Sequence, residues 1–268
     1  MSMVNPLVAI CIPTYEKIEL FKRLEKSVLL QDYDNYIVII TDNSESDVLE
    51  SYICESELSK KEGFVYIHNE RQLGASGNTD KCVRLGIQSG AKYIKILYQD
   101  DFFSYSDSLS RMVDAIENEQ KEIAFCGNYE VYDDHKTIHV LDDEDIDDIK
   151  RDVSSLFRAN LLGAPSVVIF KNMDCNFDPN LKWLLDVDFY LQVLEKKDFM
   201  YISEPLIGIG HDGEQLTDYC VRHPLMIIRE VIYVYKKNRW MHNAKNRKYV
   251  LLKVFELLLT DFKNRICR

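Results

Sequence analysis

The chain of 268 residues is 46% hydrophobic and 29% charged, and it carries a formal net charge of −11. This negative charge argues against nucleic acid as its main partner. No stretch approaches about 18 uninterrupted apolar residues, and the first residues lack the basic start and apolar run of a signal peptide, so a cytoplasmic protein is expected. Seven scattered cysteines without a CxxC pair favour free thiols with no disulfide partner and no zinc site.

Strand-like and helix-like segments alternate along the first half of the chain. Short apolar runs bounded by turn residues predict strands at residues 7–12, 36–41, 64–68, 93–97 and 123–129. The segments between them predict helices at residues 16–30, 48–59, 78–89 and 106–118. This alternation predicts right-handed βαβ units and an α/β fold with a mostly parallel sheet.

An acidic run opens the less regular second half. Residues 142–148 contain six acids without the spacing and central glycine of a calcium loop, so a solvated loop is expected there. The elements expected after it are a helix at 150–160, a strand at 166–170, a helix at 184–197, a hairpin-like pair at 199–203 and 206–209, and helices at 223–238 and 245–262.

The C-terminal segment differs from the rest of the chain in charge. Residues 236–268 hold ten Lys and Arg against two acids, a net charge of +8, which leaves −19 for the remainder. Apolar residues at helical spacing accompany this charge. Two interpretations stay open: a basic amphipathic helix on an anionic membrane, or a helix packed on the domain with a solvated basic face.

Two adjacent carboxylates, Asp100 and Asp101, directly follow the predicted strand at 93–97. In open parallel sheets, ligands bind outside the carboxyl ends of the strands. Two hard oxygen donors at that edge suit Mg²⁺ or Mn²⁺ together with a diphosphate. The alternative is a pair of acids that stabilises the N-terminus of a helix.

Three further polar clusters end predicted strands: residues 13–15, residues 41–44 and residues 69–78. The third cluster contains Gly74 and Gly77, which allow close approach of a ligand to the backbone. No GxGxxG follows the first strand and no GxxxxGK[ST] occurs, which disfavours dinucleotide-binding dehydrogenases and removes ordinary kinases and NTPases.

Taken in order, these clusters resemble those of glycosyltransferase family 2, whose members have the GT-A fold and use nucleotide-diphosphate sugars. Residues 8–15 look like the opening strand of that family. Residues 37–44 resemble its VDDxS segment with Thr41 in place of the first Asp, and residues 69–78 resemble its NxGxxxARN segment. Residues 98–101 resemble its DxD motif, with Tyr98 in the leading position. The resemblance covers about residues 8–101.

The resemblance implies a Rossmann-like, mostly parallel central sheet flanked by helices. A GT-A domain would span residues 1–222, with a nucleotide-binding half at 1–101, an acceptor half at 102–222 and a helical extension at 223–268. Asp42 would read the base, Asp101 would bind the metal and Asp100 the ribose or the metal. The full set implied to bind the nucleotide sugar is Pro13, Thr14, Tyr15, Asp42, Asn69, Arg71, Gly74, Asn78, Gln99 and Asp100.

In the second half, residues 185–191 resemble the EDxD region of the family with Leu185 in place of Glu, which makes Asp186 the catalytic base by resemblance. Asp188 is its rival, and because the two point about 200° apart on a helix, only one can face the site. The acceptor side would include Ser166, Trp183 and Asp188. His211 matches a late His of the family and would contact the diphosphate or metal, in a glycine-flanked loop able to close over the donor.

These inferences predict a cytoplasmic, inverting, hexosyltransferase-type enzyme that depends on Mn²⁺ or Mg²⁺. It would move a sugar from a UDP-sugar to a glycan or lipid-linked oligosaccharide in bacterial surface polysaccharide synthesis, such as O-antigen or capsule. Residues 236–268 would provide peripheral contact with the inner face of the membrane. Two alternatives remain: a sugar-1-phosphate nucleotidyltransferase, and a catalytically inactive protein that binds nucleotide sugars.

Overall fold

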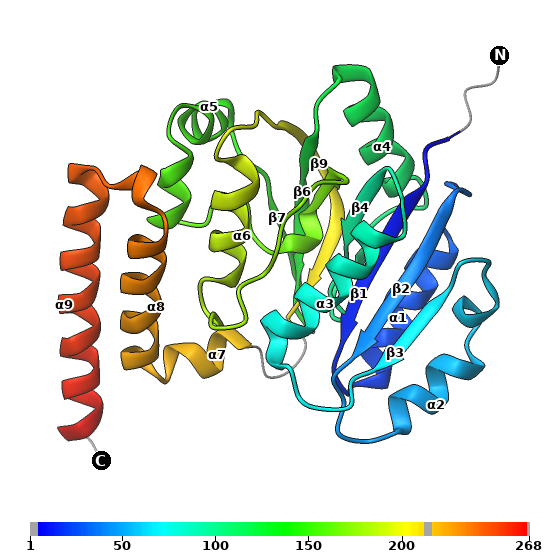
Figure 1. Ribbon diagram of the computed structural model, residues 1–268, viewed down its shortest axis with the longest axis horizontal. Helices are drawn as coiled ribbons and strands as arrows, with labels where there is room; N and C mark the ends of the chain where they lie inside the picture. The colour runs from blue at the N-terminus through cyan, green and yellow to red at the C-terminus, as the bar shows by residue number, and fades with distance from the viewer. Residues whose placement is uncertain (1–4, 212–215, 267–268) are drawn as a thin grey trace.

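A nine-stranded sheet runs through the computed structural model, which describes residues 5–211 and 216–266 (Figure 1). Its strand order is β3-β2-β1-β4-β8-β6-β9-β5, and β7 pairs with β6 off this path. The strands are β1 (Val8–Thr14), β2 (Tyr36–Asp42), β3 (Val65–His68), β4 (Tyr93–Ile96), β5 (Phe102–Phe103), β6 (Ile123–Val131), β7 (Lys136–His139), β8 (Val168–Lys171) and β9 (Met200–Gly210).

The first four strands are parallel, as the alternating pattern predicts. Their register places Thr14 opposite Asp42, and Asp42 opposite His68, so the carboxyl ends of β1, β2 and β3 are level at one edge. Beyond β4 the sheet is mixed, because β8 is antiparallel to both β4 and β6 whereas β6 and β9 are parallel. The α/β fold is therefore confirmed, and the site edge belongs to its parallel part.

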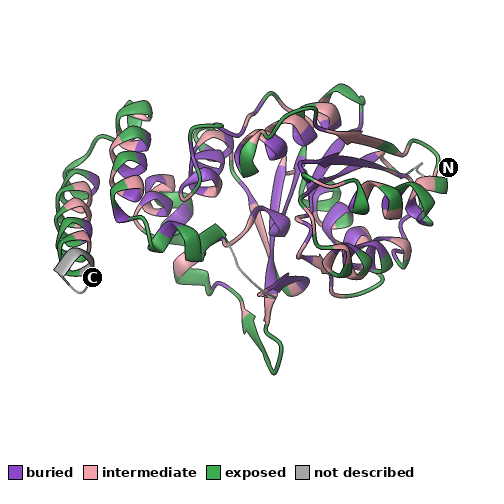
Figure 2. Ribbon diagram, turned by 90° about the horizontal axis from the view of Figure 1, so that it is seen from below, coloured by how far each residue is buried: buried purple, intermediate pink, exposed green. Residues whose placement is uncertain are grey.

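Helices cover both faces of the sheet, which explains the uninterrupted apolar runs of its strands (Figures 1 and 2). All seven residues of β1 are buried. In α1, Phe21, Leu24 and Val28 form one buried face at helical spacing. The helices are α1 (Ile18–Leu29), α2 (Val48–Glu55), α3 (Gly74–Gln88), α4 (Ser108–Glu119), α5 (Asp143–Arg151), α6 (Leu185–Leu194), α7 (Leu216–Val221), α8 (Pro224–Lys237) and α9 (Ala244–Ile266).

The loop expected at residues 142–148 is wrong, because this acidic run forms most of α5. Asp142 caps the helix by accepting a hydrogen bond from the N–H of Asp145 at 2.8 Å. The acids then occupy the first turn and Lys150 and Arg151 the last, the charge order that the helix dipole favours. The helix expected at 150–160 correspondingly begins earlier and continues only as a short 3₁₀ turn at Val153–Phe157.

The hairpin expected at residues 199–209 is also wrong, because β9 is one continuous strand beside β6. The pairing register shifts at Gly127, which lies opposite Pro205. A bulge of this kind accommodates a proline that cannot donate to the ladder. The irregular spacing of apolar residues at 203–206 therefore reflects a bulge and not a turn.

The last two helices stack outward from the body of the molecule. Ile227, Val231 and Val234 of α8 are buried and join the main core. Helix α9 packs on α8 and forms the outermost layer at one end of the molecule (Figure 1). One side of α9 is consequently left without protein cover (Figure 2).

Candidate active site

A cavity of about 1010 Å³ opens at the carboxyl edge of the parallel strands. Its wall combines the ends of β1, β4 and β9 with the first turns of α3 and α6 and with α7. Ligands bind at this edge in open α/β sheets. The residues predicted for the site that line it are Pro13, Thr14, Tyr15, Gly74, Asn78, Gln99, Asp100, Asp101, Trp183, Asp186 and His211.

Asp100 and Asp101 lie in the cavity wall directly after β4. The Oδ1 atom of Asp101 accepts a hydrogen bond from the N–H of Gly210 at 3.1 Å, which joins the acidic pair to the end of β9. Burial raises the pKa of both carboxyls, and the charge of Asp100 raises the pKa of Asp101 further. Asp101 is buried and Asp100 is partly buried, and a divalent cation would offset the cost of ionising these two adjacent carboxyls.

The donor set fits Mg²⁺ or Mn²⁺, since both ions take carboxylate and phosphate oxygens. His211 lines the same cavity, but its Nε2 pairs with the Glu130 carboxylate and its ring stacks on Tyr132 with centroids 4.4 Å apart. Within residues 5–211 and 216–266, Asp100, Asp101 and His211 are not gathered closely enough to form a three-ligand group. Asp100 and Asp101 are therefore the residues that would hold the ion.

A separate group of potential ligands, Asp47, Glu50 and His68, lies outside the cavity lining. Both ring nitrogens of His68 are engaged, Nδ1 with the Glu50 carboxylate at 2.9 Å and Nε2 with the carbonyl oxygen of Ser44 at 3.0 Å. The hydrogen bond to Glu50 raises the pKa of His68. A ring that forms both bonds as a protonated donor ties α2 to β3, and has no nitrogen left for a metal.

Gln99 fastens the turn between β1 and α1 to the acidic pair. Its Oε1 accepts from the N–H of Tyr15 at 2.7 Å, and its Nε2 donates to the carbonyl oxygens of Glu16 and Lys17. Glu16 and Lys17 both have a φ of 51°, a left-handed conformation that is uncommon outside glycine. Backbone strain of this kind persists only when surrounding bonds enforce it, and it concentrates at functional sites.

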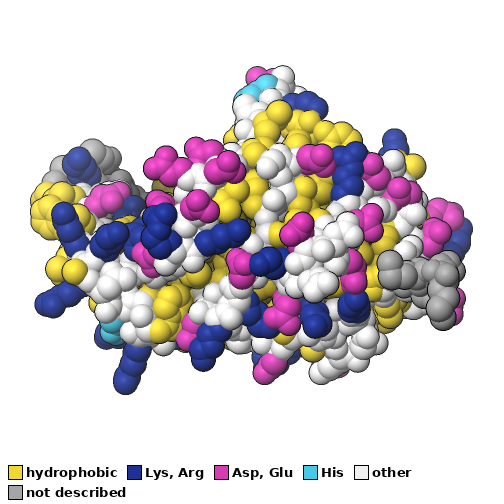
Figure 3. All heavy atoms as spheres, turned by 90° about the horizontal axis from the view of Figure 1, so that it is seen from above, with side chains coloured by type: hydrophobic (Ala, Val, Ile, Leu, Met, Phe, Trp, Pro, Cys, Tyr) yellow, Lys and Arg dark blue, Asp and Glu magenta, His cyan; other side chains and the backbone are white. Residues whose placement is uncertain are grey.

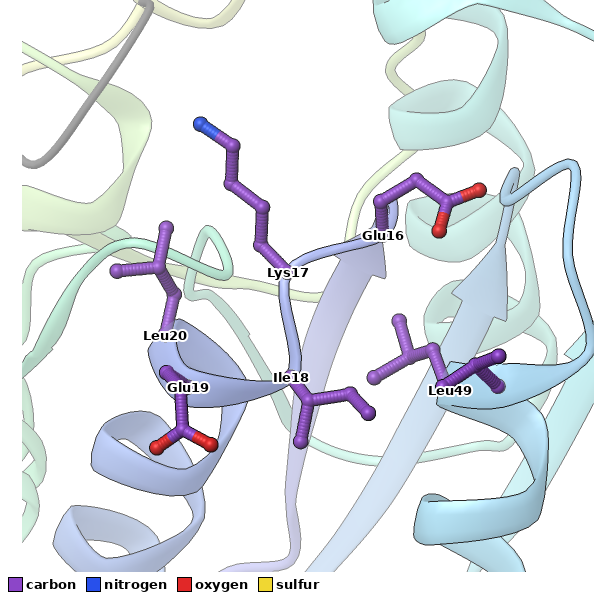
Figure 4. Close-up of a pocket in the computed structure, with 7 residues that line it drawn as sticks. Glu16, Lys17, Ile18, Glu19, Leu20 and Leu49 are labelled. Carbon is purple, nitrogen blue, oxygen red and sulfur yellow. The ribbon is translucent and has the colours of Figure 1, made fainter.

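The strained turn directs Lys17 into the site. Figure 4 shows its side chain extending away from Glu16 and from Ile18. Lys17 lines the large cavity, and the positive charges of Arg23 and Lys17 both act to lower the pKa of Asp100, against the effect of burial. It also lines a second, shallow cavity of about 510 Å³ between the start of α1 and α2, whose other lining residues are Glu16, Ile18, Glu19, Leu20, Val48 and Leu49.

Asp42, predicted to read the base, does not line the cavity. It is fully buried, and its Oδ1 accepts from the N–H and the hydroxyl of Ser44 at 2.9 and 2.6 Å. Its Oδ2 accepts from the hydroxyl of Tyr66 at 2.8 Å. With both oxygens engaged, Asp42 shapes the turn after β2, and the residue of this turn that reaches the cavity is Asn43.

The asparagines of the third cluster mainly bond to one another and to strand ends. Asn78 donates to the carbonyl oxygens of Thr14 and Thr41 at 3.1 and 3.0 Å, and it accepts from Asn69 at 2.8 Å. Asn78 lines the cavity, whereas Asn69 lies behind it. Arg71 is exposed and also lies outside the lining.

Asp186 occupies the first turn of α6 and lines the same cavity. Its Oδ1 is buried and has no hydrogen-bond partner among the described residues, and burial raises its pKa to about 7. Burial also raises the pKa of Tyr98, and the charges of Asp186, Asp101 and Asp100 raise it further, so Tyr98 lies within electrostatic reach of all three carboxyls. A carboxyl that ionises near neutral pH beside a cavity suits a general base.

Two residues predicted for the acceptor side lie outside the cavity lining. Asp188 is buried and forms an ion pair with Lys237 at 2.7 Å, which attaches α6 to α8. Ser166 is buried behind the acidic pair, where its hydroxyl accepts from the N–H of Tyr98 at 2.9 Å and forms a hydrogen bond that lowers the pKa of Asp101. Trp183, in contrast, does line the cavity. Of the glycine-flanked loop, residues 212–215 lie outside the described residues.

Sequence reasoning missed a set of cations that line the cavity: Lys17, Lys182 and Arg222. They come from three separate segments, and no local pattern distinguishes them from surface charges. It also missed Glu230, a buried residue of α8. Its carboxylate accepts from the N–H groups of Lys182, Trp183 and Leu184 at 2.8 to 3.0 Å and so holds the segment that leads into Asp186.

The fold and this site together define a glycosyltransferase of the GT-A type. The model of the family "Glycosyl transferase family 2" matches residues 9–178, which is more than half of the chain. The chain therefore belongs to glycosyl transferase family 2.

Individual relatives are distant in sequence. The chain is 23% identical to the Escherichia coli K12 glycosyl transferase WcaA, a protein named for colanic acid biosynthesis, over 94% of this chain and 88% of WcaA. TarS 1–349 of Staphylococcus aureus in complex with UDP superposes with a TM-score of 0.59 at 14% identity, over 84% of this chain and 65% of that one. The mannosyltransferase PcManGT of Pyrobaculum calidifontis in complex with GDP-Man and Mn²⁺ gives 0.60 at 12% identity, over 96% and 75%.

These structural likenesses show the fold. The superposition on TarS 1–349 with UDP covers just under two thirds of that chain, the one on TarS 1–349 with UDP-GlcNAc covers 80%, and the one on a longer TarS structure covers 40%. Among the described helices, none is both long and apolar enough to cross a membrane.

Proposed function

We propose that the protein is a metal-dependent, inverting glycosyltransferase that moves a hexosyl group from a UDP-sugar to a hydroxyl of a glycan. The observation that carries this proposal is the combination of two kinds of carboxyl in one cavity. Asp100 and Asp101 form a pair suited to a cation. Asp186, which lines the cavity from α6, has a buried oxygen without a partner among the described residues and a pKa of about 7.

The proposed reaction is a direct displacement at the anomeric carbon. The acceptor hydroxyl attacks the anomeric carbon from the face opposite the diphosphate, and Asp186 takes the hydroxyl proton as the new C–O bond forms. The bond between the anomeric carbon and the diphosphate oxygen breaks, and its electron pair leaves with the diphosphate. A bound Mn²⁺ or Mg²⁺ would supply Lewis-acid stabilisation of that leaving group.

The cations of the cavity support the same proposal. Lys17, Lys182 and Arg222 present positive charge to a site that also contains two acids, and a nucleotide diphosphate needs both cations and a metal for its charge. Lys17 is held toward Asp100 by the turn that Gln99 stabilises. We therefore assign the diphosphate to the region between Lys17 and the acidic pair.

Uridine is the nucleoside that we propose for the donor. The TarS structure contains UDP, whereas the PcManGT structure contains GDP-Man, so a guanosine donor is the direct competitor. The polar side chains that remain near the end of β2 for a base are Asn43 and Gln72, which hydrogen-bond to each other at 2.7 Å. Thermal stabilisation by UDP-sugars over GDP-sugars in the presence of Mn²⁺ would support uridine, and the reverse order would refute it.

For the acceptor, we propose a glycan or lipid-linked oligosaccharide in surface polysaccharide synthesis, such as O-antigen or capsule. The similarity to WcaA supports this class of product. A cytoplasmic protein that contacts the inner face of the membrane through residues 236–268 would meet lipid-linked acceptors there. The +8 charge of this segment supports contact with an anionic surface.

The decisive experiment measures donor hydrolysis and transfer with UDP-sugars and Mn²⁺, for the parent chain and for Asp186→Asn. The variant is expected to bind donor and to lose turnover. Asp147→Asn, an exposed acid on α5, serves as the matched control and should keep full activity. Donor binding without hydrolysis or transfer by the parent chain would instead identify an inactive nucleotide-sugar-binding protein.

A further inference from the structure

The outward side of α9 carries a stripe of large apolar side chains. Six of them are between 46% and 64% exposed: Leu251, Leu252, Phe255, Leu258, Leu259 and Phe262. We refer to these six residues as the outer face. At 100° per residue they fall within a sector of about 120°, the width of one side of an amphipathic helix.

The opposite side of α9 is the one that packs on the protein. Leu257 is buried there, and Tyr249 and Val250 pack against the main core. Figure 1 shows α9 as the outermost helix, with α8 between it and the body. Helix α9 therefore has two apolar sides, one used in the fold and one left exposed.

Basic side chains border the outer face. Lys245, Arg247, Lys248 and Lys263 are exposed. Of the two acids of α9, Glu256 is exposed and pairs with Lys253 at 3.2 Å, and Asp261 is partly buried. In Figure 3 hydrophobic side chains gather at the end of the molecule where α9 lies, with Lys and Arg beside them. This charge is the opposite of the acidic remainder of the chain.

Helix α9 is held in a fixed position by buried polar contacts. Asn246, which is fully buried, donates to the hydroxyl of Ser154 at 2.8 Å and accepts from Arg158. Helix α8 is in turn attached to the body by the ion pairs of Lys237 with Asp178 and Asp188. These contacts therefore keep the outer face of α9 in a fixed position on the body of the protein.

We propose that the outer face of α9 binds an anionic lipid bilayer, with the helix lying in the plane of the interface. An apolar sector bordered by lysine and arginine is the pattern of interfacial helices, whose apolar side chains enter the acyl boundary while the basic ones meet anionic headgroups. The helix is about 35 Å long. Because the six side chains lie within one sector of it, they can all contact one flat surface. This proposal rests on the membrane contact proposed above for residues 236–268 and names the side chains that make it, whereas lipid binding itself does not require glycosyl transfer.

Charge argues against a second copy of this chain as the occupant. A seam formed by two outer faces would bring two basic borders together, and like charges across an interface are repulsive. An acidic bilayer satisfies both the apolar and the basic character of the surface.

The test is flotation of the full chain with vesicles of phosphatidylcholine alone or mixed with phosphatidylglycerol. The chain should float with the mixed vesicles and bind neutral ones at least about tenfold more weakly, because juxtamembrane basic residues each strengthen binding to an anionic surface. The triple variant Leu251→Ser, Phe255→Ser, Phe262→Ser should lose flotation. The matched control, Leu30→Ser, Val48→Ser, Ile138→Ser, removes side chains of similar exposure elsewhere and should float like the parent.

Unchanged thermal melting of both triple variants establishes that they fold. Equal flotation of the two variants would overturn the proposal, as would equal binding of the parent to neutral and mixed vesicles. A parent that stays unbound and elutes as a dimer, with a monomeric outer-face variant, would assign the face to a second copy. Failure of glycosyl transfer alone would leave the flotation result intact.

Discussion

The two walls of the cavity hold their polar groups in opposite ways. In the wall built by residues before 102, Asn78 and Gln99 have their polar atoms bonded to strand ends and turns. In the wall built by α6, Asp186 keeps a buried oxygen that no described residue engages. We call the first wall the cradle, because hydrogen bonds fix its polar groups in place. The second wall carries a carboxyl that is costly to bury and able to accept a proton.

The two walls are also supported differently. The cradle is braced from within the sheet, where Asn78 joins the ends of β1 and β2. The segment before Asp186 is braced from outside by Glu230 of α8. Variants in each wall should therefore fail differently: those of the cradle in donor binding, and those of the α6 wall in turnover.

The largest effect is expected for Asp186→Asn. Removal of a general base should lower kcat by about 10² to 10⁴-fold while donor affinity stays within about twofold. Steady-state kinetics and donor titration measure the two quantities. A variant that keeps more than about a tenth of parental kcat would move the base elsewhere.

Asp101→Asn should be the most damaging cradle variant. It removes one of the two carboxylates available to the cation and weakens the hydrogen bond from the N–H of Gly210. The Mn²⁺-dependent affinity for the donor should therefore fall by about 100-fold. Chelation of the metal should produce the same loss in the parent chain. Donor affinity that is insensitive to both treatments would contradict a metal at this pair.

The pH dependence of the parent chain follows from the pKa of about 7 at Asp186. Its base form is the ionised one, so kcat should rise about tenfold between pH 6 and pH 8 and then level off. The free energy of unfolding changes in the other direction. The Asp186 carboxyl ionises near pH 4 in the unfolded chain, whereas in the folded protein it keeps its proton to about pH 7. The free energy of unfolding therefore falls as the pH rises from about 4 to above 7.

Asp186→Asn checks this sign independently of activity. The variant should melt at a higher temperature than the parent at pH 8, with little difference at pH 4, because it removes only the cost of the ionised form. Equal melting temperatures at pH 8 would show that Asp186 is not ionised at a buried position.

Gln99→Ala should raise the donor KM by about tenfold, with a smaller change in kcat. Without the Gln99 side chain, the left-handed turn loses the two hydrogen bonds to the carbonyl oxygens of Glu16 and Lys17, and Lys17 is held less firmly in the cavity. Adding Lys17→Ala should then change little more, since both variants remove one contribution. Additive effects of the two substitutions would separate Gln99 from Lys17.

Glu230→Gln should have the smallest effect, a severalfold loss of kcat without a change in donor affinity. An amide offers one acceptor oxygen in place of two, so at least one of the N–H groups at residues 182–184 loses its partner and Asp186 is positioned less well. The kcat of Glu230→Gln and the donor KM of Gln99→Ala together test the difference between the walls. A change of donor KM in Glu230→Gln would remove that difference.

Sequence alone determined the parallel half of the sheet and the edge at which the site lies. Apolar runs of strand length indicate strands that are buried on both faces of a sheet. A polar cluster directly after such a run lies at the edge of the sheet where the carboxyl ends of the strands meet. This reasoning located Asp100 and Asp101 after β4, and the resemblance to glycosyltransferase family 2 located Asp186. In the second half, the loop predicted at residues 142–148 and the hairpin predicted at 199–209 were wrong. The helix cap at Asp142 and the β-bulge at Gly127 determine the structure of these segments.

Only the tertiary structure decided which polar groups are available. Asp42 and Asp186 are both aspartates at element ends, yet Tyr66 and Ser44 engage the first while nothing among the described residues engages Oδ1 of the second. Lys17, Lys182 and Arg222 converge from segments far apart in the chain, and Glu230 acts on Asp186 across two helices. Hydrogen-bond partners and burial are set by distant residues, so no local pattern in the sequence contains them.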